Sequence, residues 1–214
     1  MKRIKEYLPL LIDICITILA VILYATLEEN QSGLVYLQIV VAPLLLFAII
    51  LLNKTKLIRI PIVISYLLMI HLVLALVLGS AFNFYDRIAC WDMILHGYFG
   101  FFFSYLVIAV LLNYKGENMS RGLVFVLVFF VTMGPAGLWE IYEFTLDTLL
   151  NGDSQRIEES IMLGLSPVYD TMMDMIIAIA GIVCCYISLG IDKLCNRRFM
   201  RYFYNDIHLD STKK

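Results

Sequence analysis

Residues 93–113 have the sequence MILHGYFGFFFSYLVIAVLLN, a run without any Asp, Glu, Lys or Arg. A helix of about 20 apolar residues is long enough to cross the hydrocarbon core of a bilayer. The whole chain of 214 residues has a matching composition, with 61% hydrophobic and only 16% charged residues and a mean hydropathy of +0.85. Ordinary soluble domains have roughly 45–50% apolar and 25% charged residues. The run therefore predicts a membrane span, and the composition predicts several.

Five other apolar stretches of similar length accompany this run. The six predicted spans are 8–27, 34–53, 58–79, 93–113, 122–144 and 172–191. Pro43, Pro61 and Pro135 fall inside three of them, which transmembrane helices tolerate when neighbouring groups satisfy the freed carbonyls. We expect an all-α fold, a polytopic membrane helix bundle of about six transmembrane helices that forms a single integral membrane domain over residues 1–214.

Lys and Arg are distributed unevenly between the two sides of this bundle. The side that holds both termini and the second and fourth connections carries 14 of the 16, whereas only Arg87 and Arg156 fall on the other side. Positive residues are retained in the cytoplasm, so we expect both termini there. The basic C-terminal tail, with Tyr202, Phe203 and Tyr204 interleaved, is explained either by this topology or by contact with anionic lipid heads. A net charge of −2 without blocks of like charge excludes nucleic acid as a partner.

One connection is unusually long. Residues 145–171 contain the turn signals Asn151-Gly152-Asp153 and Gly164-Leu165-Ser166-Pro167. We expect this extracytoplasmic segment to act as a lid or binding loop, because long loops inside compact domains are uncommon without such a role.

Acidic residues are found at the outer ends of the last three predicted spans. Their spacings of three, four or seven residues place each group on one helix face. The groups are Asp92 with His96, Glu140 with Glu143 and Asp147, and Asp170 with Asp174. Small residues that allow close helix packing continue the same faces. They are Gly100, Ser104, Ala136, Ala178, Gly181 and Cys185. We therefore expect the three acidic faces to meet.

The charges at this level do not balance. Six carboxylates accompany only Arg87, Arg156 and, if protonated, His96, so a buried cluster must take up protons or bind a cation. Carboxylates with one imidazole suit a divalent cation such as Mg, Mn, Ca or Zn, and a two-metal site is geometrically possible.

The residue types suggest a role for each candidate. We predict that the metal ligands are His96, Glu140, Glu143 and Asp174, and that the catalytic residues are Asp92, His96 and Asp170. In this interpretation Asp92 or Asp170 orients His96 or serves as general base. Asp92 and Asp170 also fit as caps at helix N-termini, whereas Glu140 and Glu143 lie near a helix C-terminus, where the dipole opposes negative charge.

Three ordered motifs resemble a known family. They are Asp92-Met-Ile-Leu-His96 with Gly100, Glu140-Ile-Tyr-Glu143, and Asp170-Thr-Met-Met-Asp174 with Gly181. They resemble the YjdF-like family of uncharacterised bacterial inner-membrane proteins and, more loosely, the VanZ-like proteins, some of which are linked to teicoplanin resistance. The resemblance implies a bacterial cytoplasmic membrane and marks the six Asp, Glu and His residues as the family's polar motif. At Glu143 and Asp174 the VanZ-like pattern has glutamine and asparagine, and the added negative charge here favours cation binding over drug resistance.

Three functions are compatible with such a site. The first is a metal-dependent hydrolase or transferase acting on a lipid or lipid-linked substrate. The second is a proton- or cation-coupled transporter, in which Asp13 and His71 would continue a path inward. The third is a non-catalytic membrane partner whose acids hold a structural cation. The residues leave open whether the protein is an enzyme.

Overall fold

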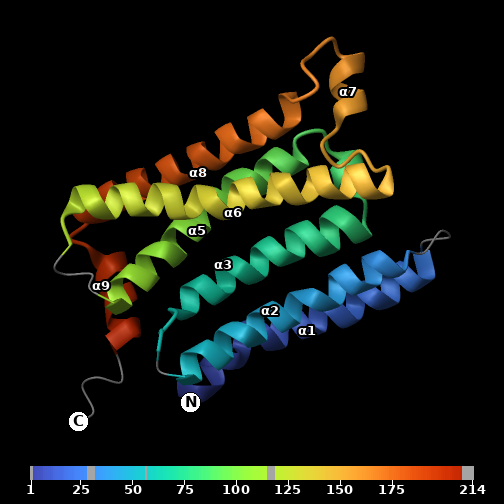
Figure 1. Cartoon of the computed structure of the whole chain (residues 1–214). Coiled ribbons are helices and arrows are strands. Elements are labelled where there is room, and N and C mark those ends of the chain that lie inside the picture. The colour runs from blue at the N-terminus through green and yellow to red at the C-terminus, as the bar shows by residue number, and fades with distance from the viewer. Residues whose placement is uncertain (1, 28–31, 56, 115–118, 209–214) are drawn as a thin grey trace. The chain divides into compact units, whose positions relative to one another are not determined.

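The computed structural model describes residues 2–27, 32–55, 57–114 and 119–208. All regular structure in these residues is helical (Figure 1). Six of the helical segments are long and apolar enough to span a membrane, which confirms the predicted fold class. They are Glu6–Leu27, Gly33–Thr55, Ile62–Ala81, Trp91–Tyr114, Arg121–Leu150 and Tyr169–Leu194.

The helices follow one another with short connections. In chain order they are α1 (Lys2–Leu27), α2 (Gly33–Thr55), α3 (Ile62–Leu72) continued by the π-helical segment η1 (Val73–Ala81), α4 (Phe84–Arg87), α5 (Trp91–Tyr114), α6 (Arg121–Leu150), α7 (Ile157–Met162), α8 (Tyr169–Leu194) and α9 (Arg198–His208). The helix α6 continues through Pro135 and ends at Asn151, which adopts a left-handed backbone with φ of 53°. Because α6 and α8 extend into the predicted loop and α7 lies inside it, the irregular connection is shorter than residues 145–171.

The chain divides into two compact units. Unit 1 comprises residues 1–91, 109–118 and 192–214, and unit 2 comprises residues 92–108 and 119–191. The single-domain expectation stays a prediction. The predicted orientation of the termini also stays a prediction. Four of the basic residues that support it lie outside the described residues: Lys56, Lys115, Lys213 and Lys214.

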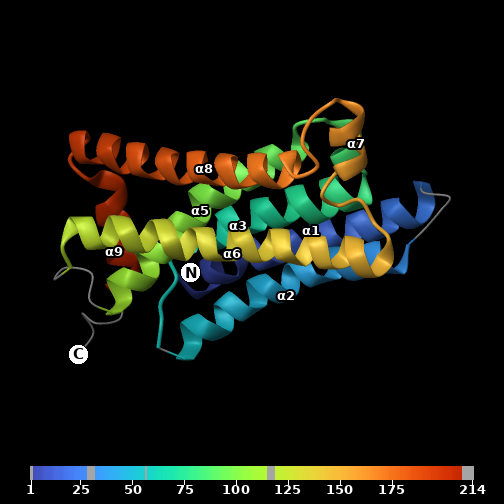
Figure 2. The same ribbon diagram turned by 45° about the horizontal axis from the view of Figure 1, so that its top comes forward.

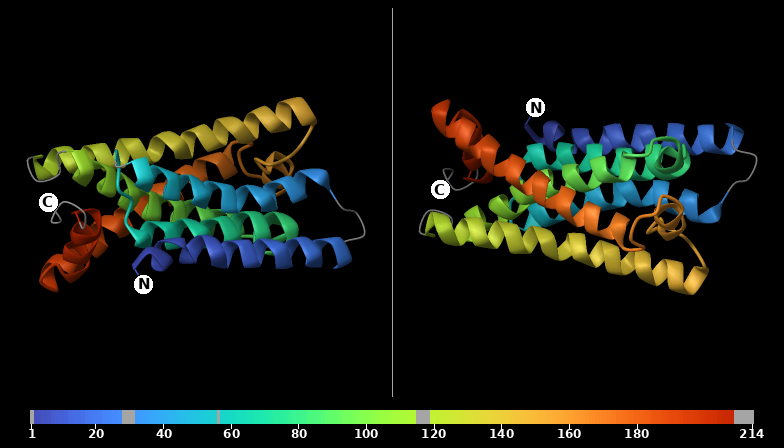
Figure 3. Two further views of the ribbon diagram at one scale, coloured as in Figure 1. Left: turned by 90° about the horizontal axis from the view of Figure 1, so that it is seen from below. Right: turned by 90° about the horizontal axis from the view of Figure 1, so that it is seen from above.

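Unit 1 is built from α1, α2 and α3 with η1, which lie side by side (Figures 1 and 3). Their facing side chains form two apolar clusters. One contains Ala20, Tyr24, Ile39, Val77 and Ala81, and the other contains Ala42, Leu46 and Leu72. The connection before α3 is held by two asparagines: Asn53 bonds the backbone N–H and C=O of Ile60, and Asn113 does the same for Arg59.

Unit 2 contains α6, α7 and most of α5 and α8, with α7 in the connection at one end of α6 and α8 (Figure 2). The helices α5 and α8 touch through their backbones. A Cβ at Gly100 would collide with the carbonyl oxygen of Ala178, and one at Gly181 would collide with that of Gly97. The predicted small-residue faces therefore bring these two helices together.

Polar side chains connect the helices of unit 2 further along. The Tyr105 hydroxyl on α5 lies 2.6 Å from the Ser188 hydroxyl on α8. Tyr186 on α8 contacts Phe125 on α6: the two rings stack with their centroids 4.3 Å apart, and the Tyr186 hydroxyl donates to the Phe125 carbonyl. These contacts fix the register in which the acidic helix ends meet.

Candidate functional site

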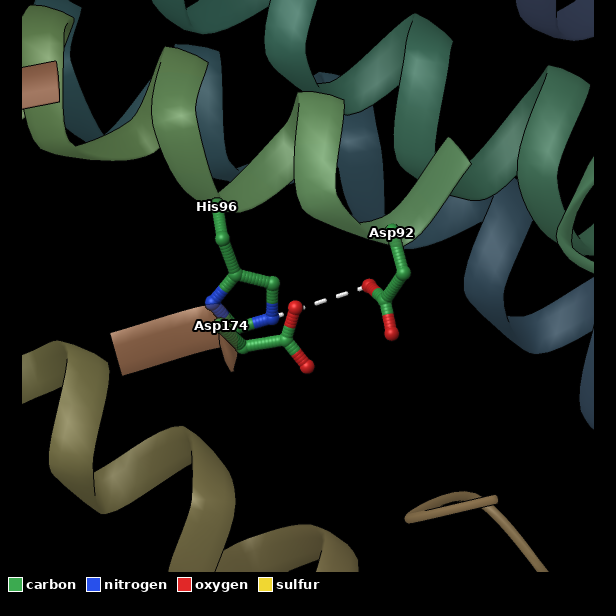
Figure 4. Close-up of side chains that lie close together, drawn as sticks. All are labelled: Asp92, His96 and Asp174. Atoms are coloured by element: carbon green, nitrogen blue, oxygen red, sulfur yellow. Dashed lines mark ion pairs between the residues drawn. The ribbon is translucent and has the colours of Figure 1, made fainter. Parts of the chain in front are cut away.

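The centre of the site is formed by Asp92 and His96 on α5 and Asp174 on α8 (Figure 4). One ligand atom from each of the three lies within 4.8 Å of the others. Spacing of four residues puts Asp92 and His96 on one face of α5. The glycine contact between α5 and α8 at Gly100 and Ala178, one turn after His96 and Asp174, brings Asp174 opposite that face. We call these three residues the Asp–His–Asp cluster.

The imidazole of His96 lies between carboxylates from two helices. Its Nε2 atom is 3.6 Å from Asp92 Oδ1 and 3.7 Å from Glu140 Oε1 of α6. Both distances are longer than ordinary hydrogen bonds. They are close to the roughly 3.4 Å that separates two ligands when each lies about 2.1 Å from a tetrahedral ion. The same nitrogen therefore faces two potential co-ligands at a spacing that suits a cation.

Several acid oxygens in this region are buried without a hydrogen-bond partner. Asp174 has a relative exposure of 0%, and neither of its oxygens has a partner. One oxygen each of Glu143 and Asp170 is in the same condition. Buried polar atoms are almost always hydrogen-bonded, because leaving one unpaired costs roughly 1–3 kcal/mol or more. The carboxyls of this region therefore lack a partner that a proton or a bound cation would supply.

Glu143 lies beside the cluster. It is buried on α6, one turn after Trp139, whose indole N–H donates to Glu143 Oε1 at 2.8 Å. The carboxylate is also close enough to interact electrostatically with Asp92, Glu140 and Asp174. Sequence reasoning missed the role of Trp139, although its position four residues before a buried acid is the signal that indicates it.

Asp147 has a different role from the two glutamates that precede it. Its two oxygens accept backbone N–H bonds from Ser154 and Gln155, at 2.7 and 2.9 Å. Gln155 in turn donates from its side chain to the Thr171 hydroxyl on α8. Asp147 therefore anchors the connection to α8, and the acidic triplet of the sequence divides into two site residues and one structural residue.

One positively charged side chain, Arg156, acts on the acids of the site. Arg156 adopts a left-handed backbone with φ of 47° just before α7, and its guanidinium lies 3.1 Å from Glu159. It also interacts electrostatically with Asp92, Asp170 and Asp174. Arg121 and Arg156 are the only Lys or Arg residues in unit 2, against nine Asp and Glu. The Arg156 side chain thus offsets part of the negative charge of the acids, and the site remains negatively charged.

The other two polar residues singled out within the spans, Asp13 and His71, belong to unit 1. Asp13 lies on α1 with a relative exposure of 1%, and neither carboxyl oxygen has a hydrogen-bond partner. Asp13 is therefore a buried acid of unit 1, in addition to the buried acids of unit 2.

Comparison with known proteins identifies relatives of unknown function. The family model described as "Predicted membrane protein (DUF2238)" matches residues 10–193, and the resemblance to the YjdF-like family is consistent with this match. An uncharacterised protein of Thermotoga maritima is 32% identical over 110 residues, which cover 51% of each chain, so the match spans about half of that relative. The comparisons do not show the looser similarity to VanZ-like proteins. No solved structure matches the chain.

Proposed function

We propose that this chain, which belongs to the DUF2238 family of predicted membrane proteins, binds a divalent cation. The cation would be held by acidic and histidine residues at one end of the membrane helices. The bound cation would serve hydrolysis or group transfer on a lipid or lipid-linked substrate. This proposal adds a cation, a reaction class and a substrate class to the membrane location that the six apolar helices indicate.

The observation that carries the proposal is the position of Asp174. Its carboxyl is fully buried, has no hydrogen-bond partner, and lies beside His96 and Asp92 from the opposite helix (Figure 4). A fixed negative charge in an apolar environment is costly unless it is paired or coordinates an ion. A divalent cation held by Asp92, His96 and Asp174 would satisfy all three, with Glu140 completing the set from α6.

The surrounding residues then have separate roles. Glu143 and Asp170 each have one oxygen without a partner, and either could accept a proton from an attacking water. Trp139 fixes the Glu143 carboxylate through its indole N–H. The cation would supply Lewis-acid polarisation of a phosphoryl or carbonyl oxygen. A lipid substrate fits because Asp92 lies in the first turn of α5 and Asp174 in the second turn of α8. Both helices are long and apolar enough to span a membrane, so these residues lie close to where lipid headgroups are found.

The test is metal content, measured by mass spectrometry on detergent-purified protein after identical dialysis. The native chain, the double variant Glu143→Gln/Asp174→Asn and the control Glu158→Gln are compared, since Glu158 is an exposed acid on α7. We expect near-stoichiometric metal in the native and control proteins and none in the double variant. Absence of metal from all three folded proteins would contradict a cation site.

Activity is tested next with lipid and lipid-linked substrates. Turnover that depends on added metal and disappears in Glu143→Gln and Asp174→Asn would support the enzyme. If both variants keep full turnover, the residues are not catalytic. If they lower only the melting temperature, the cation is structural.

Asp13 favours one alternative, a proton- or cation-coupled transporter. A further buried acid without a hydrogen-bond partner, on the membrane helix α1, is typical of proteins that move protons or ions. We would reconstitute the native chain and Asp13→Asn in liposomes and impose proton, sodium and potassium gradients. Coupled flux that is lost in the variant would support transport, whereas background flux under every gradient would contradict it.

A further inference from the structure

The chain from the end of α8 through α9 carries its acids and its bases in different environments. Asp192 is buried and accepts backbone N–H bonds from Phe199 and Met200, at 2.8 and 3.1 Å, so it caps the start of α9. Asp206 accepts the backbone N–H of Ile62 at 2.8 Å and so caps the start of α3. Both carboxylates are therefore engaged by backbone groups of unit 1.

The basic side chains of the same segment are all exposed. They are Lys193, Arg197, Arg198 and Arg201, and we call them the basic face. At 100° per residue, Arg198 and Arg201 lie on one side of α9, and Phe203 and Ile207 lie on the other. Phe203 and Ile207 are 0% and 6% exposed, so the apolar side of α9 is buried. The opposite side presents positive charge without a neighbouring free acid in α9.

The position of this face is set by α8. That helix is long and apolar enough to span a membrane and ends at Leu194, one residue after Lys193. Leu194 and Tyr202 remain 84% and 53% exposed among the basic residues. Exposed apolar and aromatic groups interleaved with Lys and Arg at the end of a span are typical of segments that lie at the level of lipid headgroups.

We propose that the basic face binds the phosphate groups of anionic phospholipids in the bilayer that surrounds the protein. The guanidinium groups of Arg198 and Arg201 match phosphate oxygens in charge and in hydrogen-bond geometry. A helix already held by its buried apolar side and two caps loses little conformational freedom on binding. The site is therefore preorganised for headgroups, and it is independent of the acid cluster in unit 2.

The test uses the whole chain of 214 residues in neutral detergent micelles at low ionic strength, titrated with fluorescent phosphatidylglycerol or phosphatidylcholine. The variant Arg198→Gln/Arg201→Gln removes two charges from the basic face. The control Lys54→Gln/Arg121→Gln removes two exposed charges elsewhere. Each basic residue near an anionic lipid contributes about a fivefold gain in affinity. We expect the α9 variant to bind phosphatidylglycerol about 25-fold more weakly, with phosphatidylcholine unchanged and the control within about twofold of native.

Two results would overturn the proposal. Equal weakening in both double variants would mean that only net charge matters. Unchanged phosphatidylglycerol binding in the α9 variant would mean that these residues only set membrane topology. Should the glutamine variant fail to fold, Arg198→Lys/Arg201→Lys retains the charges, and its phosphatidylglycerol affinity must remain within about fivefold of native and fall with added salt.

Discussion

Among the residues of the site, Asp174 gives the most direct physical argument for a bound cation. Its carboxylate is enclosed without a hydrogen-bond partner, while Asp92 and Glu140 add negative charge nearby. Like charges that share a buried site oppose one another until a proton or a cation compensates them. The folded protein therefore carries an electrostatic cost here that an asparagine would not have.

This cost predicts opposite effects of Asp174→Asn with and without metal. In excess chelator the variant should melt at a higher temperature than the native protein, because one repelled charge is gone. With added Mn²⁺ only the native protein should gain stability, and the variant's affinity should be at least roughly 100-fold lower. Thermal unfolding in detergent, followed by tryptophan fluorescence, measures both. A variant that is stabilised by Mn²⁺ as strongly as the native protein would contradict the assignment of Asp174 as a ligand.

Arg156 gives a second prediction at the same scale. Its positive charge acts on the acids of the site, so it competes with any cation bound there. Arg156→Gln should therefore tighten Mn²⁺ binding by roughly two- to tenfold at low ionic strength. Isothermal titration calorimetry measures this change, and Arg121→Gln, at the other end of α6, serves as the control. If Arg156→Gln bound Mn²⁺ more weakly than the native protein, the role of Arg156 would instead be to hold the acids in place.

At the scale of helices, the site depends on a backbone contact that contains no ligand atom and lies one helical turn beyond His96 and Asp174. A Cβ at Gly100 would meet the carbonyl of Ala178, whereas a Cβ at Gly190 near the end of α8 would meet no atom within 4 Å. Gly100→Ala should push α5 away from α8, destabilise the protein by roughly 1–3 kcal/mol, and lower metal affinity. Gly190→Ala should be neutral or stabilising by up to about 1 kcal/mol, as expected for a helical glycine. Urea unfolding in micelles and metal titration of both variants test this.

The control variant makes the outcome informative. If Gly100→Ala and Gly190→Ala behaved alike, the α5–α8 contact would not position the cluster. Loss of metal binding only in Gly100→Ala, with helical content retained, is the expected result.

The helices and the site could be predicted to different depths. Hydropathy predicts six spans because crossing a bilayer requires long apolar helices, and spacings of three and four residues predict which acids share a face. The roles of Asp147 and Asp206 could not be predicted, because each accepts N–H groups from a separate segment of the chain. The π-helical segment after Leu72 and the short α7 also have no signal in apolar periodicity.

At the scale of the whole molecule, helix order predicts which helix ends share a side of the bilayer. Consecutive spans alternate in direction, so we predict that the start of α5 and the end of α8 lie on opposite sides of the membrane. Two native cysteines mark these ends: Cys90 precedes α5, Cys195 follows α8, and both are exposed. The excess of Lys and Arg on the side of the termini further predicts that Cys195 is cytoplasmic.

Single-cysteine variants that keep only Cys90 or only Cys195 test this topology in intact cells with a membrane-impermeant maleimide. We expect Cys90 to be labelled from outside and Cys195 to be labelled only after the membrane is permeabilised. The reverse pattern would place the acid cluster at the cytoplasmic face and the basic face outside, against the rule that retains positive residues in the cytoplasm. Labelling of both from outside would contradict the number of spans itself. The experiment thus decides which membrane leaflet supplies a lipid substrate to the cluster and which supplies headgroups to α9.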